Sequence, residues 1–242
     1  MLNFLYKIYV CLVVVPVVVL FTAIGGLIII LTMRIWPAFA CAIPPIWARV
    51  IYRSSLCRLS TLGIENINQQ DSYVVVANHI SHFDIFVLYG WLPLDLKWVA
   101  KKELEKIPIF GATLVALGSV FIDRKKRGAA AETLRKFKEN MAPGASVMFF
   151  PEGTRGDGKT LLPLKKGAFK MAKDLDLPIL PITVVGTEEI LPGGTLDLRY
   201  GSSCFVVHSP IDVSDVRQST TEELVNRAST AISSALPKPN EE

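Results

Sequence analysis

Two histidines and an aspartate stand close together directly after an apolar run that is suited to a buried strand. His79 and Asp84 have the spacing H-x-x-x-x-D, and the whole chain contains only 3 histidines. Imidazole is the side chain whose ordinary pKa lies near neutrality, so it can serve as a general base without help. A carboxylate bonded to its far ring nitrogen fixes the tautomer and stabilises the imidazolium. The spacing therefore indicates a pair that activates a hydroxyl group.

No serine nucleophile accompanies this pair. The sequence has no G-x-S-x-G elbow, and neither Ser202 nor Ser203 has the context that such a nucleophile needs. We therefore expect direct transfer from an activated donor to an alcohol, without a covalent intermediate on the protein. A structural interpretation competes with this one, because Ser81-x-x-Asp84 resembles a helix capping box in which the carboxylate only binds backbone amides.

Four short blocks follow one another in a fixed order. N-H-x-x-x-x-D begins at Asn78, G-S-V-F-I-D-R spans 118–124, F-P-E-G-T-R spans 150–155, and a proline between aliphatic residues lies in L-P-I at 180–182. In residue types and order these blocks resemble those of the glycerophospholipid acyltransferases, and among them the bacterial 1-acyl-sn-glycerol-3-phosphate acyltransferases. The resemblance covers nearly the whole chain, although 195–242 carries no recognisable block.

The resemblance implies a role for each matching residue. His79 would be the base, and Asp84 would orient it. A guanidinium fork suits a dianionic phosphomonoester, and the family's second block contributes such an arginine. The residues that the resemblance assigns to the acceptor's phosphate are Lys101, Arg124, Glu152, Gly153, Thr154 and Arg155.

The implied reaction moves an acyl group from acyl-CoA or acyl-carrier protein to the sn-2 hydroxyl of 1-acyl-sn-glycerol 3-phosphate. Its product is phosphatidic acid, an intermediate of phospholipid biosynthesis. Glycerol 3-phosphate, another lysophospholipid or an aminolipid stay open as acceptors. A membrane protein that binds anionic lipid without chemistry is the alternative from another class. We expect no metal and no cofactor beyond the thioester co-substrate, because neither metal-ligand spacing nor a nucleotide-binding loop is present.

Beyond residue 60, short β-branched or aromatic runs alternate with helix-like segments. This alternation predicts an α/β domain with a mostly parallel central sheet flanked by helices. The polar blocks follow strands, and ligands of such folds gather beyond the carboxyl ends of the strands. The predicted strands are Tyr73–Ala77, Leu96–Ala100, Ser119–Ile122, Ser146–Phe150, Ile179–Val185 and Cys204–His208, and the predicted helices are Asp84–Trp91, Ile107–Leu117, Gly128–Met141, Lys166–Leu175 and Thr220–Leu236.

The first sixty residues are apolar and precede this domain. Ile8–Met33 contains 26 residues without a charge, which as a helix would reach about 39 Å, against a hydrocarbon core of about 30 Å. A single tilted span and two helices that dip into one leaflet both fit, and a cleavable signal is the weaker interpretation because the run is long. We expect membrane-anchoring helices in 1–60 and the acyltransferase domain in 61–242.

The charges suggest which side of the membrane carries the domain. Lys97–Lys173 holds 17 Lys or Arg against 7 Asp or Glu, although the whole chain carries only +4. Beside an apolar anchor, such a region fits anionic lipid headgroups and the bilayer better than nucleic acid. Arginines after the apolar run and cysteines without a disulfide pattern predict the inner membrane, with the catalytic domain on the cytoplasmic face. These arginines are Arg34, Arg49, Arg53 and Arg58.

Overall fold

The computed structural model describes residues 2–122, 137, 141 and 144–237. Its centre is a seven-stranded sheet in the order β1-β7-β6-β2-β5-β3-β4. Every neighbouring pair in it is parallel except the antiparallel pair of β6 and β7. The predicted mostly parallel α/β sheet is therefore confirmed. The strands are β1 (Arg58–Leu62), β2 (Val74–Ala77), β3 (Asp95–Lys101), β4 (Val120–Ile122), β5 (Ala145–Phe149), β6 (Ile179–Val185) and β7 (Ser202–Val207).

Strand β2 lies at the middle of the sheet and leads directly to the His and Asp pair. All four of its residues are buried, and it pairs in parallel with β5 on one side and with β6 on the other. A strand covered on both faces needs apolar side chains throughout, and β-branched residues fit the pleated surface best. The sequence V-V-V-A meets both requirements. Because β2 is held firmly in the sheet, the position at which the chain leaves the sheet after Ala77 is fixed.

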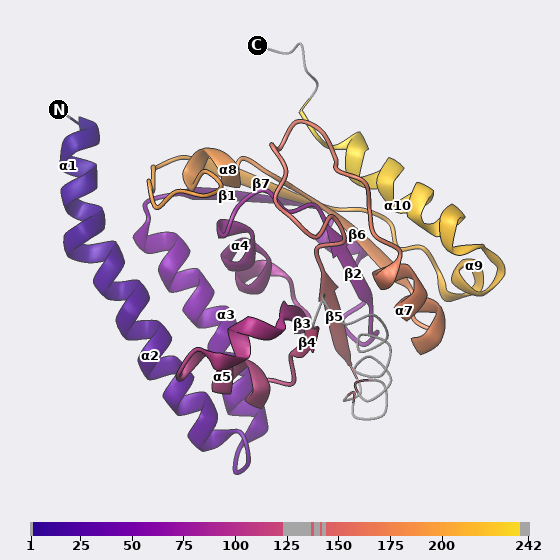
Figure 1. Ribbon diagram of the computed structural model, residues 1–242, viewed down its shortest axis with the longest axis horizontal. Helices are drawn as coiled ribbons and strands as arrows, with labels where there is room; N and C mark the ends of the chain where they lie inside the picture. The colour runs from indigo at the N-terminus through magenta and orange to yellow at the C-terminus, as the bar shows by residue number, and fades with distance from the viewer. Residues whose placement is uncertain (1, 123–136, 138–140, 142–143, 238–242) are drawn as a thin grey trace.

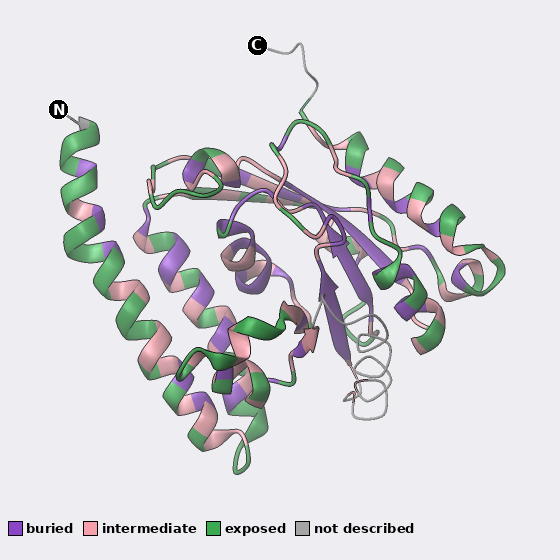
Figure 2. Cartoon of the chain, viewed as in Figure 1, coloured by how far each residue is buried: buried purple, intermediate pink, exposed green. Residues whose placement is uncertain are grey.

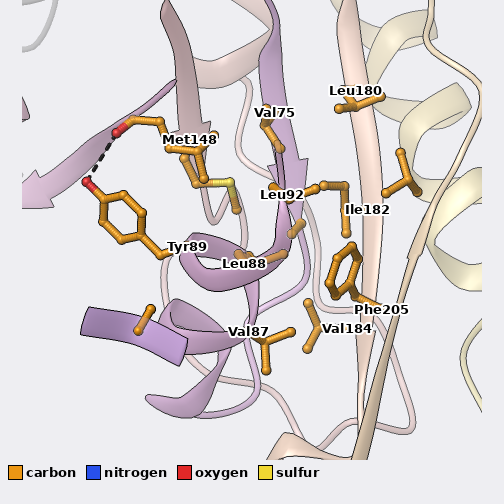
Figure 3. Close-up of a cluster of buried hydrophobic side chains, with 14 of the residues drawn as sticks. Val75, Val87, Leu88, Tyr89, Leu92, Met148, Leu180, Ile182, Val184 and Phe205 are labelled. Atoms are coloured by element: carbon orange, nitrogen blue, oxygen red, sulfur yellow. Dashed lines mark hydrogen bonds between the residues drawn. The ribbon is translucent and has the colours of Figure 1, made fainter. Parts of the chain in front are cut away.

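Helices cover both faces of the sheet (Figure 1). One face packs against α3 and α4 in a cluster that includes Val75, Leu88, Leu180 and Phe205 (Figure 3). The other face packs against α7 and α10, and Thr220 caps α10 in a capping box with Glu223. The helices of the domain are α4 (Phe83–Trp91), α5 (Phe110–Ala116), α7 (Gly167–Leu175), α8 (Thr187–Ile190), α9 (Val213–Gln218) and α10 (Thr221–Ser234), with short 3₁₀ turns η2 (Ile64–Asn66) and η3 (Lys102–Lys106).

The amino-terminal segment forms a helical hairpin. α1 (Leu2–Tyr9), the π-helical turn η1 (Val10–Val14) and α2 (Val15–Thr32) follow without a break, and α3 (Pro37–Ser54) returns beside them. The Tyr6 hydroxyl donates to the Ser55 carbonyl oxygen at 2.8 Å, which ties the two ends of the hairpin together.

Much of this hairpin is exposed (Figure 2), and many of its exposed side chains are large and apolar. The most apolar 18-residue window of the helix Asn3–Thr32 has a mean hydropathy of 2.9, and only 17% of this window is buried. By length and composition it is the one helix in the described part of the chain that could cross a membrane. Exposed side chains such as Leu12 and Leu20 line it. The hairpin therefore has the composition of a membrane-associated element.

Two features of the fold were not predicted. Strand β1 pairs with β7 at the edge of the sheet, and none of its residues is buried. Its sequence therefore has only a weak apolar pattern from which a strand could be predicted. The predicted domain boundary at residue 60 lies inside this strand. The short helices α8 and α9 were also absent from the prediction, and most of the predicted helix Gly128–Met141 lies outside the described residues.

Candidate active site

The carboxyl end of β2 is held to its neighbour by a buried amide. The Asn78 side chain donates to the Val184 carbonyl oxygen at 2.8 Å and accepts from the Val184 N–H at 2.7 Å. An asparagine side chain can satisfy both a backbone donor and a backbone acceptor in this way, which continues the ladder where β2 itself ends. The two bonds fix the direction in which the next residue, His79, leaves the sheet.

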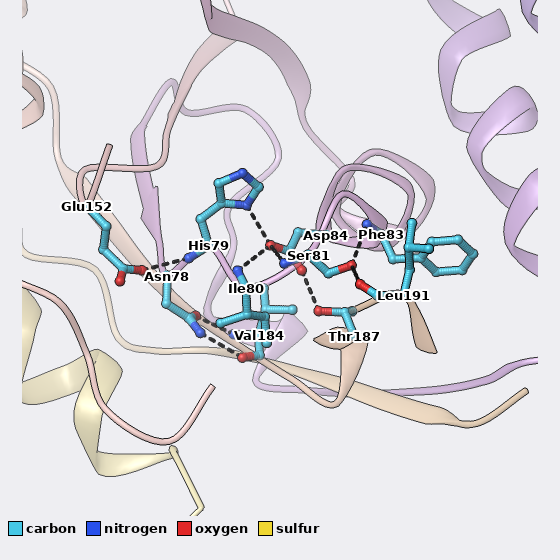
Figure 4. A network of polar contacts seen from close by, with 10 residues as sticks. All are labelled: Asn78, His79, Ile80, Ser81, Phe83, Asp84, Glu152, Val184, Thr187 and Leu191. Carbon is cyan, nitrogen blue, oxygen red and sulfur yellow. Dashed lines mark hydrogen bonds and ion pairs between the residues drawn. The ribbon is translucent and has the colours of Figure 1, made fainter. Parts of the chain in front are cut away.

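His79 and Asp84 form the predicted pair (Figure 4). Nδ1 of His79 lies 2.7 Å from Oδ2 of Asp84, and the aspartate side chain is fully buried while that of the histidine is 18% exposed. Because an ionised carboxylate only accepts hydrogen bonds, Nδ1 carries the proton and Nε2 keeps its lone pair. Figure 4 shows the ring above the carboxylate, with its other nitrogen turned away from it. The arrangement is that of an oriented general base.

The carboxylate of Asp84 also binds backbone amides of the turn before α4, as the structural interpretation expected. Oδ2 accepts from the backbone N–H groups of Ile80 at 2.8 Å and Ser81 at 3.0 Å. Oδ1 accepts from the hydroxyl of Thr187, which opens α8 after β6. Four donors thus surround one buried carboxylate, so the same side chain holds the His79 ring and binds the backbone amides of its turn.

The F-P-E-G-T-R loop closes over the histidine. The Phe150 ring stacks on the His79 ring with centroids 4.1 Å apart and planes 14° apart. Glu152 accepts from the backbone N–H of His79 at 2.7 Å and from that of Leu162 at 3.1 Å. The N–H of Gly156 donates to the His79 carbonyl oxygen at 2.8 Å. The loop after β5 therefore fixes the backbone of the turn after β2.

Glu152 is held differently from the prediction, which placed it among the phosphate-binding residues. Both of its carboxylate oxygens accept from backbone N–H groups, and its residue is only 4% exposed. Burial raises the pKa of Glu152, and its two backbone hydrogen bonds oppose that rise. A buried acid that is already bonded in this way positions the His79 backbone and does not attract a phosphate.

Two cations stand beside the pair, and neither has an anionic partner among the described residues. Lys101 ends β3 and is exposed, while Arg155 is half-buried, and no ion pair of either is found in the described part of the chain. Nη1 of Arg155 is buried and has no hydrogen-bond partner there. Burial and the Arg155 charge lower the pKa of the neighbouring His82. A site with unpaired cations suits an anionic ligand.

The remaining predicted residues are placed unevenly. Gly153 and Thr154 line the same cavity as Arg155. Gly153 has φ +74°, and an added Cβ would lie 2.2 Å from Nζ of Lys165, so glycine suits this turn. Arg124 lies outside the described residues. The structure thus brings together all of the predicted site residues except Arg124, whose role stays a prediction.

An apolar cavity of about 410 Å³ begins at this group of polar residues. His79, Lys101 and Arg155 line it together with apolar side chains of α2, α3 and α5. One cavity therefore joins the imidazole of His79, two cations and a hydrocarbon-like wall. Apolar lining residues from the helices include Phe21, Ile29, Ile43, Trp47, Phe110 and Leu114.

The model of the Acyltransferase family matches residues 58–185, which is more than half of the chain. The chain belongs to the acyltransferase family. The resemblance implied by the four blocks is thereby confirmed, and all of them lie within the matched range.

Several named enzymes are similar to this acyltransferase. It is 35% identical over 182 residues to a 1-acyl-sn-glycerol-3-phosphate acyltransferase of Chlamydomonas reinhardtii, covering 74% of this chain and 53% of that protein. It is 34% identical to the Helicobacter pylori enzyme of the same name over 155 residues, covering 62% and 65%. The chain spans about half the length of the algal and plant relatives that it matches.

A solved structure shares the fold over almost its full length. The crystal structure of the 1-acyl-sn-glycerophosphate acyltransferase PlsC from Thermotoga maritima matches with a TM-score of 0.81 and 26% sequence identity. The match covers 96% of this acyltransferase and 93% of that chain. The match therefore extends into the amino-terminal hairpin.

Sequence reasoning missed one residue of this acyltransferase's site. Thr187 lies 103 positions after Asp84 and donates its buried hydroxyl to that carboxylate. Its signal was a hydroxyl residue directly after a glycine at the end of a buried strand, in V-V-G-T. Nothing in the sequence showed that β6 lies beside β2, so the partner of this hydroxyl was not predictable.

Proposed function

We propose that this chain transfers an acyl group from a thioester donor to the sn-2 hydroxyl of 1-acyl-sn-glycerol 3-phosphate, yielding phosphatidic acid. Acyl-CoA or acyl-carrier protein supplies the thioester. One observation carries the proposal: an oriented histidine and two cations, which form no ion pair with any described residue, line one cavity with an apolar wall. These groups match the hydroxyl, the phosphate and the acyl chain of the reactants. The names of the relatives support the same acceptor.

The reaction proceeds by direct transfer. Nε2 of His79 takes the proton of the acceptor hydroxyl as its oxygen attacks the thioester carbonyl carbon. The imidazolium is stabilised by Asp84, whose carboxylate is already held by three other donors. When the tetrahedral intermediate collapses, the C–S bond breaks and the imidazolium returns its proton to the leaving thiolate. No covalent bond to the protein forms, so positioning of the two substrates supplies much of the rate.

The phosphate is held beside the histidine by charge. Lys101 and Arg155 bind the phosphomonoester, and Arg124 joins them on the strength of the family resemblance. Glu152 contributes indirectly, because it fixes the backbone of His79. The apolar cavity takes an acyl chain, since hydrocarbon burial stabilises binding by about 0.8 kcal/mol for each CH₂.

The reaction takes place at a membrane. The exposed apolar side of the amino-terminal hairpin supports docking to a bilayer, and arginines after the apolar run favour the cytoplasmic face of the inner membrane. A lipid acceptor with its chain in the bilayer would reach the cavity through the same element, because α2 also lines it.

The purified full-length protein in liposomes tests the proposal. It is incubated with an acyl thioester and a panel of acceptors, namely lysophosphatidate, glycerol 3-phosphate and a lysophospholipid with a neutral headgroup, and the products are identified by mass. We expect phosphatidic acid from lysophosphatidate. In the His79→Ala variant we expect a loss of about 10²- to 10⁴-fold in turnover with unchanged binding to liposomes. Equal rates for native protein and variant would disprove the role of the base.

A further inference from the structure

A second, more polar hollow of about 460 Å³ adjoins the apolar cavity. Thr154 and Arg155 line both spaces. Among the described residues that line the hollow, none belongs to α1, α2, α3 or α5, so it is separate from the apolar helices. The other lining residues are Ile80, Gly156, Asp157, Glu188, Pro192 and Gly193.

Two residues that line the hollow each have a buried side-chain atom without a hydrogen-bond partner among the described residues. Nη1 of Arg155 and Oε2 of Glu188 are buried, and neither has a hydrogen-bond partner in the described part of the chain. A buried polar group left without a partner costs about 1–3 kcal/mol, and more when it is charged. Both costs would be removed by a ligand that accepts from Arg155 and donates to Glu188.

Glu188 is held at the edge of the reacting groups. It follows Thr187, whose hydroxyl donates to the Asp84 carboxylate, so the hollow borders the catalytic pair. Its side chain packs against Gly158, where an added Cβ would lie 2.3 Å from Oε1. Glycine at position 158 thus leaves space for the carboxylate, and Glu188 keeps its place without a ligand.

The charges in the hollow select the kind of ligand. The carboxylates of Glu188 and Asp157 would repel a phosphate dianion, which the apolar cavity with Lys101 and Arg155 receives better. A neutral amide offers both an N–H donor and a carbonyl acceptor. Thioesters of CoA and of carrier protein share one arm, pantetheine, which has its first amide two carbons from the sulfur.

We propose that this hollow binds the pantetheine arm of the thioester donor, with Glu188 accepting the N–H of its first amide and Arg155 donating to an amide carbonyl oxygen. This inference rests on the proposed function. It places the leaving thiol on the polar side of His79 and the acyl chain on the apolar side. Glu188 is therefore a donor-binding residue that the sequence did not indicate.

The test compares three donors with the same acyl group, carried on CoA, on N-acetylcysteamine, which keeps the first amide, and on ethanethiol, which has none. In Glu188→Ala we expect the KM for the two amide-containing donors to rise about tenfold, as for a hydrogen bond to a charged group. The KM for the ethanethiol ester and for lysophosphatidate should stay unchanged. Glu189→Ala is the matched control, because Glu189 is the exposed neighbour on the same helix and should behave as native.

The outcomes separate this inference from the function on which it rests. An equal rise in KM for all three donors would show that Glu188 acts through Thr187 and Asp84 and would overturn the inference. An unchanged KM for all three donors would overturn it as well. If the native enzyme accepts both CoA and carrier-protein thioesters, Glu188→Ala should raise the KM for both by a similar factor. An increase confined to one of them would also overturn the inference. If the native protein formed no phosphatidic acid from any thioester, the proposed function itself would be disproved.

Discussion

At the scale of single residues, the site depends on one buried carboxylate with several partners. Asp84 binds the His79 ring, two backbone amides and the Thr187 hydroxyl. Loss of its charge would leave the imidazolium without a counter-charge but would keep most of the turn. An isosteric change can therefore separate the proposed catalytic contribution of this residue from its structural one.

For Asp84→Asn we expect a fall in kcat of about 10²- to 10⁴-fold. The amide cannot stabilise the imidazolium, and one of its two ends is a donor that faces other donors. Steady-state rates with lysophosphatidate measure the loss, while circular dichroism of the variant should match the native protein. A variant that keeps its native rate would show that His79 needs no orienting acid.

Thr187→Val should lower the free energy of unfolding by about 1.5–3 kcal/mol, the range for a hydrogen bond to a charged group. Thr187→Ser keeps the hydroxyl and is the control. Denaturant unfolding in detergent compares the two variants with the native protein. If valine and serine gave the same stability, the hydroxyl would not be bonded to Asp84 in solution.

At the scale of elements, side chains continue hydrogen bonding where strands end. Asn78 joins the end of β2 to β6, and Thr183 joins β6 to α10 by donating to the Ile232 carbonyl oxygen at 2.7 Å. Because the Thr183 hydroxyl donates there, it accepts from Nε2–H of His208 at 2.8 Å. His208 thus has a structural contact with the hydroxyl that joins β6 to α10.

Asn78→Ala should destabilise the sheet and misplace His79 together. It leaves the N–H and the carbonyl of Val184 without partners, at a cost of about 1–3 kcal/mol for each buried group. The free energy of unfolding, measured with denaturant, and the turnover rate should both decrease. Asn68→Ala, at an exposed loop position, serves as the control. Native turnover in Asn78→Ala would show that the end of β2 is fixed by other contacts.

His208 makes the stability depend on pH. Burial lowers its pKa from 6.5, so the unfolded chain binds a proton more readily and stability falls as the pH drops below about 6.5. In His208→Gln we expect a smaller loss of unfolding free energy between pH 7 and pH 5. Some loss should remain, because the pKa of His82 is lowered as well. If the unfolding free energies of the native protein and His208→Gln fell in parallel as the pH was lowered, this assignment would be contradicted.

At the scale of the whole molecule, the apolar hairpin and the α/β domain form one structure. α3 packs against α4, and α2 against α5. The side of α2 that faces outward remains exposed, with Leu20 at 55%. We therefore expect the outer side of α2 to make the contact with a membrane.

Leu20→Asp should weaken binding to liposomes by about tenfold, because a carboxylate in an apolar environment costs about 2.5–3.5 kcal/mol at the centre of a membrane helix and less near its surface. Thr230→Asp on the exposed side of α10 is the control. Co-sedimentation with vesicles measures the binding. Equal binding by both variants would place the docking surface elsewhere.

Local patterns predicted much of this molecule. The six predicted strands are all present, since each is an apolar run with a distinct end, and His79 and Asp84 meet because they belong to one turn. The order of the strands was not predictable, because pairing depends on contacts between distant segments. For the same reason the bond from Thr187 to Asp84 and the partners of Glu152 emerged only from the structure.

One helix has two roles that engineers would wish to separate. The inner side of α2 forms a wall of the cavity that begins at His79, and its outer side carries the exposed leucines. Trimming the hairpin to obtain a readily soluble enzyme would therefore open that compartment to water. A water-soluble version should be sought by substituting polar side chains for the outward apolar ones, while leaving Gly25, Gly26 and Ile29 unchanged.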